Sequence, residues 1–259
     1  MDKIINTIRK KAKQVFDRIK NEKLKETLLQ AIPFWAASLI TGLVAVLYAR
    51  VFSYAEGITV SVFHYKSWLL FILSPICFIS SWWIVKRFSP YATGSGIPQV
   101  IAAIELEKPN KNSSVTKLLG FRVIITKVIS STIFVIGGAA VGREGPTIQI
   151  SGSIFRKINE ILPHWWPKNS RQNMILSGAA AGLAAAFNAP LGGVMFAIEE
   201  LAETHMGNFK TSVLSGVIIA GLLVQSIAGP YLYLGFPVVN NLSHWILVDV
   251  ALVAVIAGL

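Results

Sequence analysis

Long apolar runs without a charged residue constrain this chain more than any other feature. They include Thr27–Ala49, Ser67–Val85, Gln172–Ile198 and Thr211–Val248. Each is long enough to cross a hydrocarbon core of about 30 Å as a helix. Charged residues make up only 14% of the chain, against about a quarter in a typical soluble protein. A β-barrel would instead show short alternating segments. The sequence therefore predicts an all-α, multi-pass membrane protein.

The N-terminal segment is strongly basic and precedes the first apolar run. Its first 26 residues hold nine Lys/Arg and four acidic residues, and the whole chain has a net charge of +11. The positive-inside rule explains this excess better than nucleic-acid binding does, so no nucleic-acid partner is expected. Apolar residues recur there at helical spacing. Residues 1–29 are predicted to form an amphipathic helix on the cytoplasmic membrane face, with the N-terminus inside.

Turn signals and apolar periodicity divide the remaining chain into several helices, some too short to span a bilayer alone. They are expected near Pro33–Tyr54, Ser67–Arg87, Tyr91–Glu107, Val115–Ala140, a stretch ending at about Ile161, two short helices broken at "NAP" near 189, Thr211–Ala228, and a last one from Trp245. Interrupted helices at membrane depth often line cavities or substrate sites. The chain stops within an apolar run, so we expect it to be the front part of a longer protein.

Two short motifs share one design, "GSGIP" at 94–98 and "GREGP" at 142–146. In each, a glycine-rich turn leads through a proline into an apolar helix. Proline suits the first helical turn, where no intrahelical N–H bond is lost. Each motif therefore presents free N–H groups and the positive end of a helix dipole. Two such ends are predicted to bind an anion without a full positive charge, with the Ser95 hydroxyl as a further donor.

Glu144 lies within the second motif, where a charge at membrane depth is costly. A carboxylate beside a helix N-terminus is a tethered anion that can compete with a free one. Protonation would release it, so Glu144 is a candidate gate and proton carrier. A simple helix-capping glutamate is the alternative. Arg143 is interpreted mainly as a structural or field-shaping residue.

Other polar residues in the apolar segments give weaker signals. Glu200 is a candidate proton acceptor at the end of an apolar helix, and its neighbour Glu199 fits a solvated helix end slightly better. Lys127 is either a buried charge near the pathway or a snorkelling lysine.

Cys77 is expected to be a buried structural thiol. No metal-ligand spacing, phosphate-cradling loop or nucleophile elbow occurs, so neither a metal, a cofactor nor an enzyme activity is expected.

The motifs together resemble those of the CLC chloride channels and chloride/proton antiporters. The resemblance rests on "GSGIPQV", "GREGPTIQI" and "SGAAAGLAAAFNAPLGGVMFAIEE", and it spans most of residues 30–230. It implies a CLC-like inverted-repeat fold with tilted and broken helices. Residues 30–235 would form the first repeat with the anion-site motifs, and residues 236–259 a loop and the start of a truncated second repeat. It also implies a homodimer with one anion pathway per subunit.

The resemblance assigns roles to individual residues. Ser95 would coordinate chloride in the segment of Gly94, Ser95, Gly96, Ile97 and Pro98. Glu144 would be the gating glutamate in the motif of Gly142, Arg143, Gly145 and Pro146. Glu200 would transfer protons, as in antiporters. Gln99 and Ile101 stand where some bacterial relatives carry acids, which leaves Lys127 without an obvious partner.

Chloride/proton antiport is the leading hypothesis, with chloride and H+ as the transported ions. A passive voltage- or pH-gated chloride channel is the alternative within the family. A non-transporting membrane scaffold is the alternative outside it, although that would leave the polar motifs at membrane depth unexplained. An intramembrane hydrolase is disfavoured because no nucleophile–base pair is present. The expected location is the inner (plasma) membrane of a bacterium.

Overall fold

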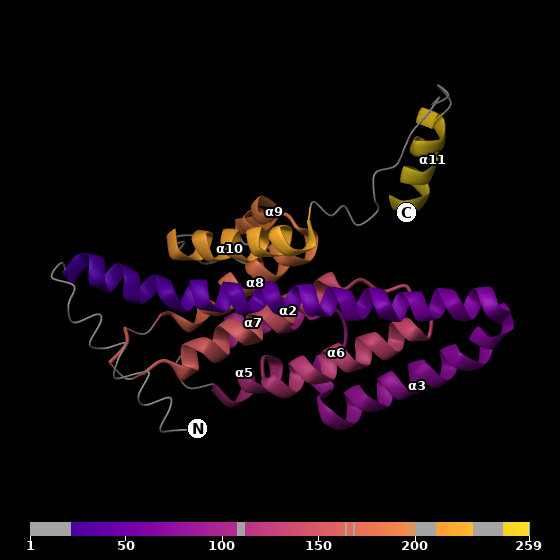
Figure 1. The fold of residues 1–259 in the computed structure, drawn as a ribbon, viewed down its shortest axis with the longest axis horizontal. Coiled ribbons are helices and arrows are strands. Elements are labelled where there is room, and N and C mark those ends of the chain that lie inside the picture. Colours follow the sequence, from indigo (N-terminus) through magenta and orange to yellow (C-terminus); the bar gives the residue numbers. More distant parts are fainter. Residues whose placement is uncertain are drawn as a thin grey trace.

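The computed structural model describes residues 22–107, 112–163, 165–167, 169–196, 198–199, 211–229 and 246–258. The regular elements in these ranges are helices (Figure 1), as the sequence predicts. They are α2 (Glu22–Lys66), η1 (Ser67–Leu69), α3 (Leu70–Phe88), η2 (Pro90–Ala92), α4 (Ile97–Leu106), α5 (Asn112–Leu118), α6 (Phe121–Ile136), α7 (Glu144–Ile161), α8 (Arg171–Phe187), α9 (Pro190–Phe196), α10 (Thr211–Ala228) and α11 (Ile246–Gly258).

Helix α2 is much longer than the predicted span Pro33–Tyr54. It has 45 residues, or about 68 Å at 1.5 Å per residue, and crosses the whole bundle in Figure 1. It packs along α6, α7, α8 and α10. Near its far end, the Thr59 hydroxyl is 2.8 Å from the Val135 carbonyl and 3.1 Å from that of Ile136. This contact with the end of α6 accounts for a helix that continues past Tyr54.

The predicted helix Val115–Ala140 is two helices, α5 and α6, separated at Leu119–Gly120. Side chains of α7 satisfy the carbonyls that the break exposes. Gln149 donates to Leu118 O at 3.1 Å, and Arg156 donates to Leu119 O at 2.8 Å. The break is therefore stabilised by tertiary hydrogen bonds that helical periodicity cannot reveal.

Helices α7 and α8 form the centre of the bundle. The run Ala179–Ala181 of α8 is buried, and Gly178 and Gly182 lie against the Ser151 region of α7. A Cβ at Gly182 would lie 2.6 Å from Ser151 Oγ, so only glycine permits this approach. Two glycines four positions apart thus let α7 and α8 pack closely. Gly138 and Gly142 have the same spacing but lie in the loop before α7, so they do not bring two helices together.

The predicted break at "NAP" is also present, between α8 and α9. Asn188 caps α8 in the left-handed conformation, with φ 54°. Its side-chain amide donates to Gly229 O at 3.1 Å, so the turn is tied to the end of α10.

Helix α3 packs against α6 and supports one wall of the site described below. The Phe78 and Phe134 ring centroids are 4.6 Å apart, and Ser81 donates to Ser130 O at 2.9 Å. Cys77 is a free, buried thiol on the same helix, as expected.

Large apolar side chains cover much of the outer surface. Those at least half exposed include Leu43 and Leu47 of α2, Phe71, Ile79 and Trp83 of α3, and Val253 and Ile256 of α11. Within the described ranges, two helical stretches are long and apolar enough to cross a membrane, Lys25–Phe88 and Ser114–Ile136. An apolar surface of this extent belongs in lipid or against another protein surface.

The predicted division into segments stays a prediction. Residues 1–21 lie outside the described residues, and α2 continues through the proposed boundary after residue 29. The boundary after residue 235 also lies outside them.

Candidate functional site

The first motif forms a tight turn that leads into α4. Gly94 and Gly96 have φ values of 67° and 108°, which side chains with a Cβ rarely adopt. Pro98 occupies the first turn of α4, as the sequence predicts. The exposed Ser95 places its Oγ 3.4 Å from the Ile97 N–H at that helix end. The turn therefore combines a hydroxyl group with the N-terminus of a helix.

The second motif forms the start of α7, with Glu144 as its first residue. Arg143 precedes the helix as its N-cap, and its side chain makes no capping bond. Pro146 is buried in the first turn, as predicted. The half-buried Glu144 side chain folds back over Gly142, where an added Cβ would overlap with Oε2. No ion pair reaches this carboxylate from the residues that the structure describes.

The two motifs are in direct contact. A Cβ at Gly145 would lie 2.7 Å from Ser95 O, and one at Gly96 would lie 2.8 Å from Gln149 Cβ. Two glycines thus let the N-terminal ends of α4 and α7 meet. The two helix ends therefore meet, as a shared anion site would require, and both helix dipoles present their positive ends in one region.

A cavity of about 770 Å³ adjoins this contact. Its walls come from both motifs, α3, η2 and α6. They include Gly94, Ser95, Gly142, Gly145, Pro146, Lys86, Lys127, Ser130 and Ser131. The cavity therefore brings the first motif, the second motif and two lysines to one space.

Lys127 has partners that the sequence did not reveal. Its side chain is buried, and Nζ donates to Ala92 O at 2.8 Å and to Gly94 O at 2.6 Å. The residue is thus a buried charge beside the first motif and not a snorkelling lysine. As expected, no carboxylate among the described residues pairs with Lys127; the backbone carbonyls of Ala92 and Gly94 accept its hydrogen bonds instead.

Arg143 lies on the other side of the second motif. It is buried and lines a separate cavity of about 290 Å³ with Arg50 of α2, Thr147 of α7 and Asn188 after α8. This placement fits a structural or field-shaping residue. The role of Arg143 in the motif stays a prediction.

The two acidic candidates near the end of α9 are placed differently. Glu199 is exposed, whereas Glu200 lies outside the described residues, so its proposed proton-transfer role stays a prediction. Among the residues that the structure describes, no cluster of three or more His, Cys, Asp or Glu side chains could hold a metal ion.

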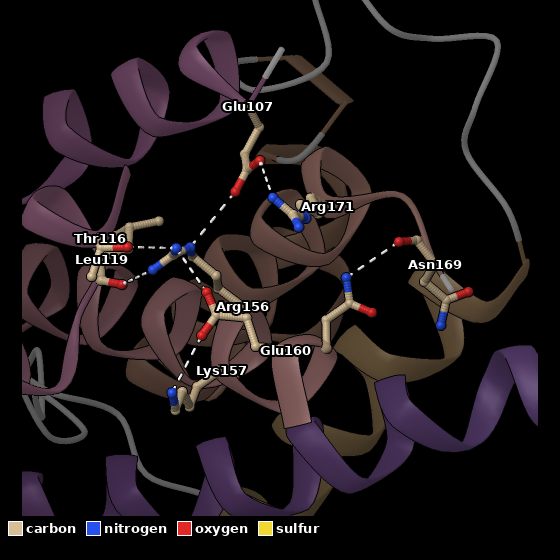
Figure 2. A network of polar contacts seen from close by, with 9 residues as sticks. Glu107, Thr116, Leu119, Arg156, Lys157, Glu160, Asn169 and Arg171 are labelled. Carbon is tan, nitrogen blue, oxygen red and sulfur yellow. Dashed lines mark hydrogen bonds and ion pairs between the residues drawn. The ribbon is translucent and has the colours of Figure 1, made fainter. Parts of the chain in front are cut away.

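An ion network that sequence reasoning missed lies toward the opposite end of α7 (Figure 2). Arg156 Nη2 is 2.7 Å from Glu160 Oε1, and Arg156 Nε is 3.6 Å from Glu107 Oε1. Arg171 Nη1 is 3.6 Å from Glu107 Oε2. Arg156 also donates to Thr116 Oγ1 at 2.8 Å. The network joins the ends of α4 and α5 to α7 and α8, and only the four-residue spacing of Arg156 and Glu160 hinted at it.

Comparison with known proteins decides the family. A family model described as voltage gated chloride channel matches residues 76–259, which is more than half of the chain. The chain belongs to the CLC family of chloride channels and chloride/proton antiporters. This is a family of transporters, not of enzymes. CLC membership also makes the chain a membrane protein, as the apolar runs predict.

Individual CLC relatives agree with this assignment. The H(+)/Cl(−) exchange transporters ClcA of Salmonella schwarzengrund (strain CVM19633) and Salmonella agona (strain SL483) are each 32% identical over 224 residues. Those alignments cover 82% of this chain and 46% of each relative. The crystal structure of a slow cyanobacterial Cl−/H+ antiporter aligns with a TM-score of 0.65 and 25% identity. The alignment covers 87% of this chain and 53% of the antiporter chain. The predicted CLC-like fold is therefore confirmed over about half of the antiporter. The chain spans about half the length of the curated relatives it matches.

Proposed function

We propose that the full-length protein exchanges chloride for protons across a membrane. The observation that carries this proposal is the contact between Ser95 and Gly145, which joins the turn before α4 to the turn bearing Glu144 beside one cavity. The exchange activity named for the Salmonella relatives supports it. So does the antiporter named for the cyanobacterial structure.

Chloride would bind where the two helix ends meet. The Ser95 hydroxyl and the N–H groups of the first motif, Gly94 to Pro98, would donate to it. Partial charges of this kind hold an anion less tightly than a contacting lysine would, which suits rapid passage.

Glu144 would gate this site by competing with chloride for the same N–H groups. As a carboxylate it would occupy the anion place, and protonation would release it. The second motif, including Gly142, Arg143, Gly145 and Pro146, would provide the backbone for both states. Glu200 would receive protons on the inner side. It would then be a second protonatable residue on a proton path, and such a path favours exchange over a passive channel.

Reconstitution of the full-length protein into liposomes tests the proposal. An imposed chloride gradient should drive uphill proton movement through an antiporter. A passive chloride channel would carry chloride without moving protons, and a scaffold would carry neither. Either of the last two results would reject the exchange proposal.

The cellular setting and the assembly are proposed from the family resemblance. We propose a homodimer, with one pathway per subunit, in the inner membrane of a bacterium, with the N-terminus in the cytoplasm. Cross-linking of the full-length protein in membranes tests the dimer, and labelling of a cysteine introduced near residue 1 in intact cells tests the topology.

A further inference from the structure

Four consecutive backbone carbonyls lead into the first motif, and each accepts a hydrogen bond from a side chain. Gln149 donates to Tyr91 O at 3.2 Å, and Gln99 donates to Thr93 O at 2.7 Å. Lys127 donates to the other two, Ala92 O and Gly94 O, at 2.8 and 2.6 Å. The donors come from α4, α6 and α7, so three helices fix one short stretch of backbone.

Lys127 differs from the two glutamines because it brings a full charge. Its exposed fraction is 3%, and no carboxylate in the described part of the chain forms an ion pair with it. The negative groups in direct contact with Lys127 Nζ are therefore the partial charges of Ala92 O and Gly94 O. A carbonyl dipole cannot cancel a unit charge, so a positive potential extends to the adjoining cavity, which Lys127 and Ser95 both line.

The bond to Gly94 also orients the peptide unit that precedes Ser95. In a planar trans peptide, the C=O and the N–H point in opposite directions. Gly94 O points at the Lys127 ammonium group, so the Ser95 N–H points away from it. Gly94 adopts φ 67°, and a glycine backbone has many accessible conformations, so a hydrogen bond that selects one of them matters here. A carbonyl turned the other way would present negative charge where an anion is to bind.

We infer that Lys127 is a positioning residue for the anion site: through the carbonyls of Ala92 and Gly94 it sets the direction of the Ser95 turn, and it adds positive potential without contacting the anion. Gln99 assists by holding Thr93. This inference rests on the proposed chloride site and goes beyond it by naming what builds that site. It also explains how Lys127 can raise affinity without binding chloride as a direct ligand.

Chloride titration of the purified full-length protein by calorimetry tests the inference, together with chloride/nitrate competition fluxes in liposomes. Lys127→Met removes both charge and donors. We expect its chloride Kd to rise about tenfold or more, because both the Coulomb attraction and the fixed turn are lost. The chloride/nitrate ratio should also fall. Lys127→Arg keeps charge and donors and should recover most of the affinity.

Lys86→Met is the matched control. Lys86 lines the same cavity, is exposed, and its Nζ lies 4.7 Å from the Trp82 ring centroid. The described side chains that donate to the carbonyls of residues 92–94 are Lys127 and Gln99, not Lys86. Its loss should change the chloride Kd less than about twofold, because solvent screens an exposed charge. Gln99→Leu removes the hydrogen bond to Thr93 O without altering charge. It should lower the chloride/nitrate ratio without the large rise in chloride Kd expected for Lys127→Met.

The outcomes distinguish failure of the proposed chloride transport from failure of the positioning role. Failure of the wild-type protein to bind or carry chloride would reject the proposed function itself. Wild-type chloride binding with an unchanged Kd in folded Lys127→Met, or an equal loss in Lys86→Met, would overturn the positioning role alone. If Lys127→Met does not fold, the other two variants decide. An unchanged chloride/nitrate ratio in Gln99→Leu, or loss of chloride affinity in Lys127→Arg, would overturn the positioning role.

Discussion

Gly145 lies directly against Ser95, so closely that a Cβ on Gly145 would be 2.7 Å from Ser95 O and 2.9 Å from Ser95 Cβ. These two residues belong to motifs about 50 positions apart in sequence. Their contact holds the N-terminus of α4 against the N-terminus of α7. The geometry of the candidate site thus depends on residue 145 being glycine, with no side chain between the two turns.

Gly145→Ala should displace the Ser95 turn and weaken chloride binding. The added methyl group overlaps backbone atoms that cannot simply rotate away, and overpacking of this kind costs about 1–3 kcal/mol. Chloride calorimetry and thermal unfolding of the full-length protein measure both effects. Gly57→Ala is the control, because that α2 glycine has open space and alanine favours a helix by about 0.5–1 kcal/mol. Equal chloride binding in the two variants would contradict the prediction.

Arg156→Met should destabilise the protein without changing anion preference. It leaves the Glu107 carboxylate, whose side chain is 3% exposed, with Arg171 as its one remaining ion-pair partner among the described residues. Removing one partner of a buried ion pair typically costs about 3–5 kcal/mol. Denaturant unfolding measures this loss, and competition fluxes measure the chloride/nitrate ratio. Lys157→Met, at a side chain that is 62% exposed, should change stability by less than about 0.5 kcal/mol. A changed ratio in Arg156→Met would show that the network reaches the site.

The sequence predicted those parts of the fold and site that depend on local patterns. Apolar runs located most helices, and Gly-Pro turns located the starts of α4 and α7. Charged or small residues in an apolar background also marked Ser95 and Glu144. These signals work because a helix N-terminus and a lipid-facing run have local sequence requirements.

Features that depend on distant contacts were not predictable. The break between α5 and α6 is stabilised by Gln149 and Arg156, which follow it by about 30 residues or more. The carbonyl partners of Lys127 precede it by 33 and 35 positions and carry no side-chain signature. Backbone acceptors are present at every residue, so only the fold shows which of them a buried lysine meets.

Ser95→Pro should weaken the preference for chloride over nitrate. The Ser95 hydroxyl would no longer donate to the bound ion, and the smaller hydration cost of nitrate would then count for more. Proline also removes the N–H that the Gly94–Lys127 bond orients. Competition fluxes in the full-length protein measure the ratio. An unchanged ratio would remove Ser95 from the anion site.

Glu200→Gln should abolish proton coupling and leave passive chloride flux. The side chain keeps its shape and loses only its titratable proton. Glu199→Gln is the matched control, because Glu199 is its exposed neighbour and should matter much less. Proton and chloride fluxes in liposomes separate the two. A reversed pattern would move the role to Glu199, and pumping by both variants would place the proton path elsewhere.

Glu144→Gln or Glu144→Ala should give chloride conduction without proton coupling, at a rate nearly independent of pH. Glu144 begins α7 beside free N–H groups and the positive end of the helix dipole, which stabilise its charge at membrane depth. The same groups can stabilise chloride, so carboxylate and ion would compete for one place. Protonation of Glu144 would vacate that place and load a proton at once. A neutral side chain can do neither.

A glutamate that only stabilises the helix predicts a different result. Its loss would cost about 0.3–1 kcal/mol through the helix dipole and leave coupling intact. Asp249 offers the matched control, because it also lies in the first turn of a helix, α11, which lies apart from α7 in Figure 1. Proton flux driven by a chloride gradient therefore decides: Asp249→Asn should retain it and Glu144→Gln should lose it. Persistent uphill proton movement in Glu144→Gln would overturn the gating role, because one residue could then not couple the two ions.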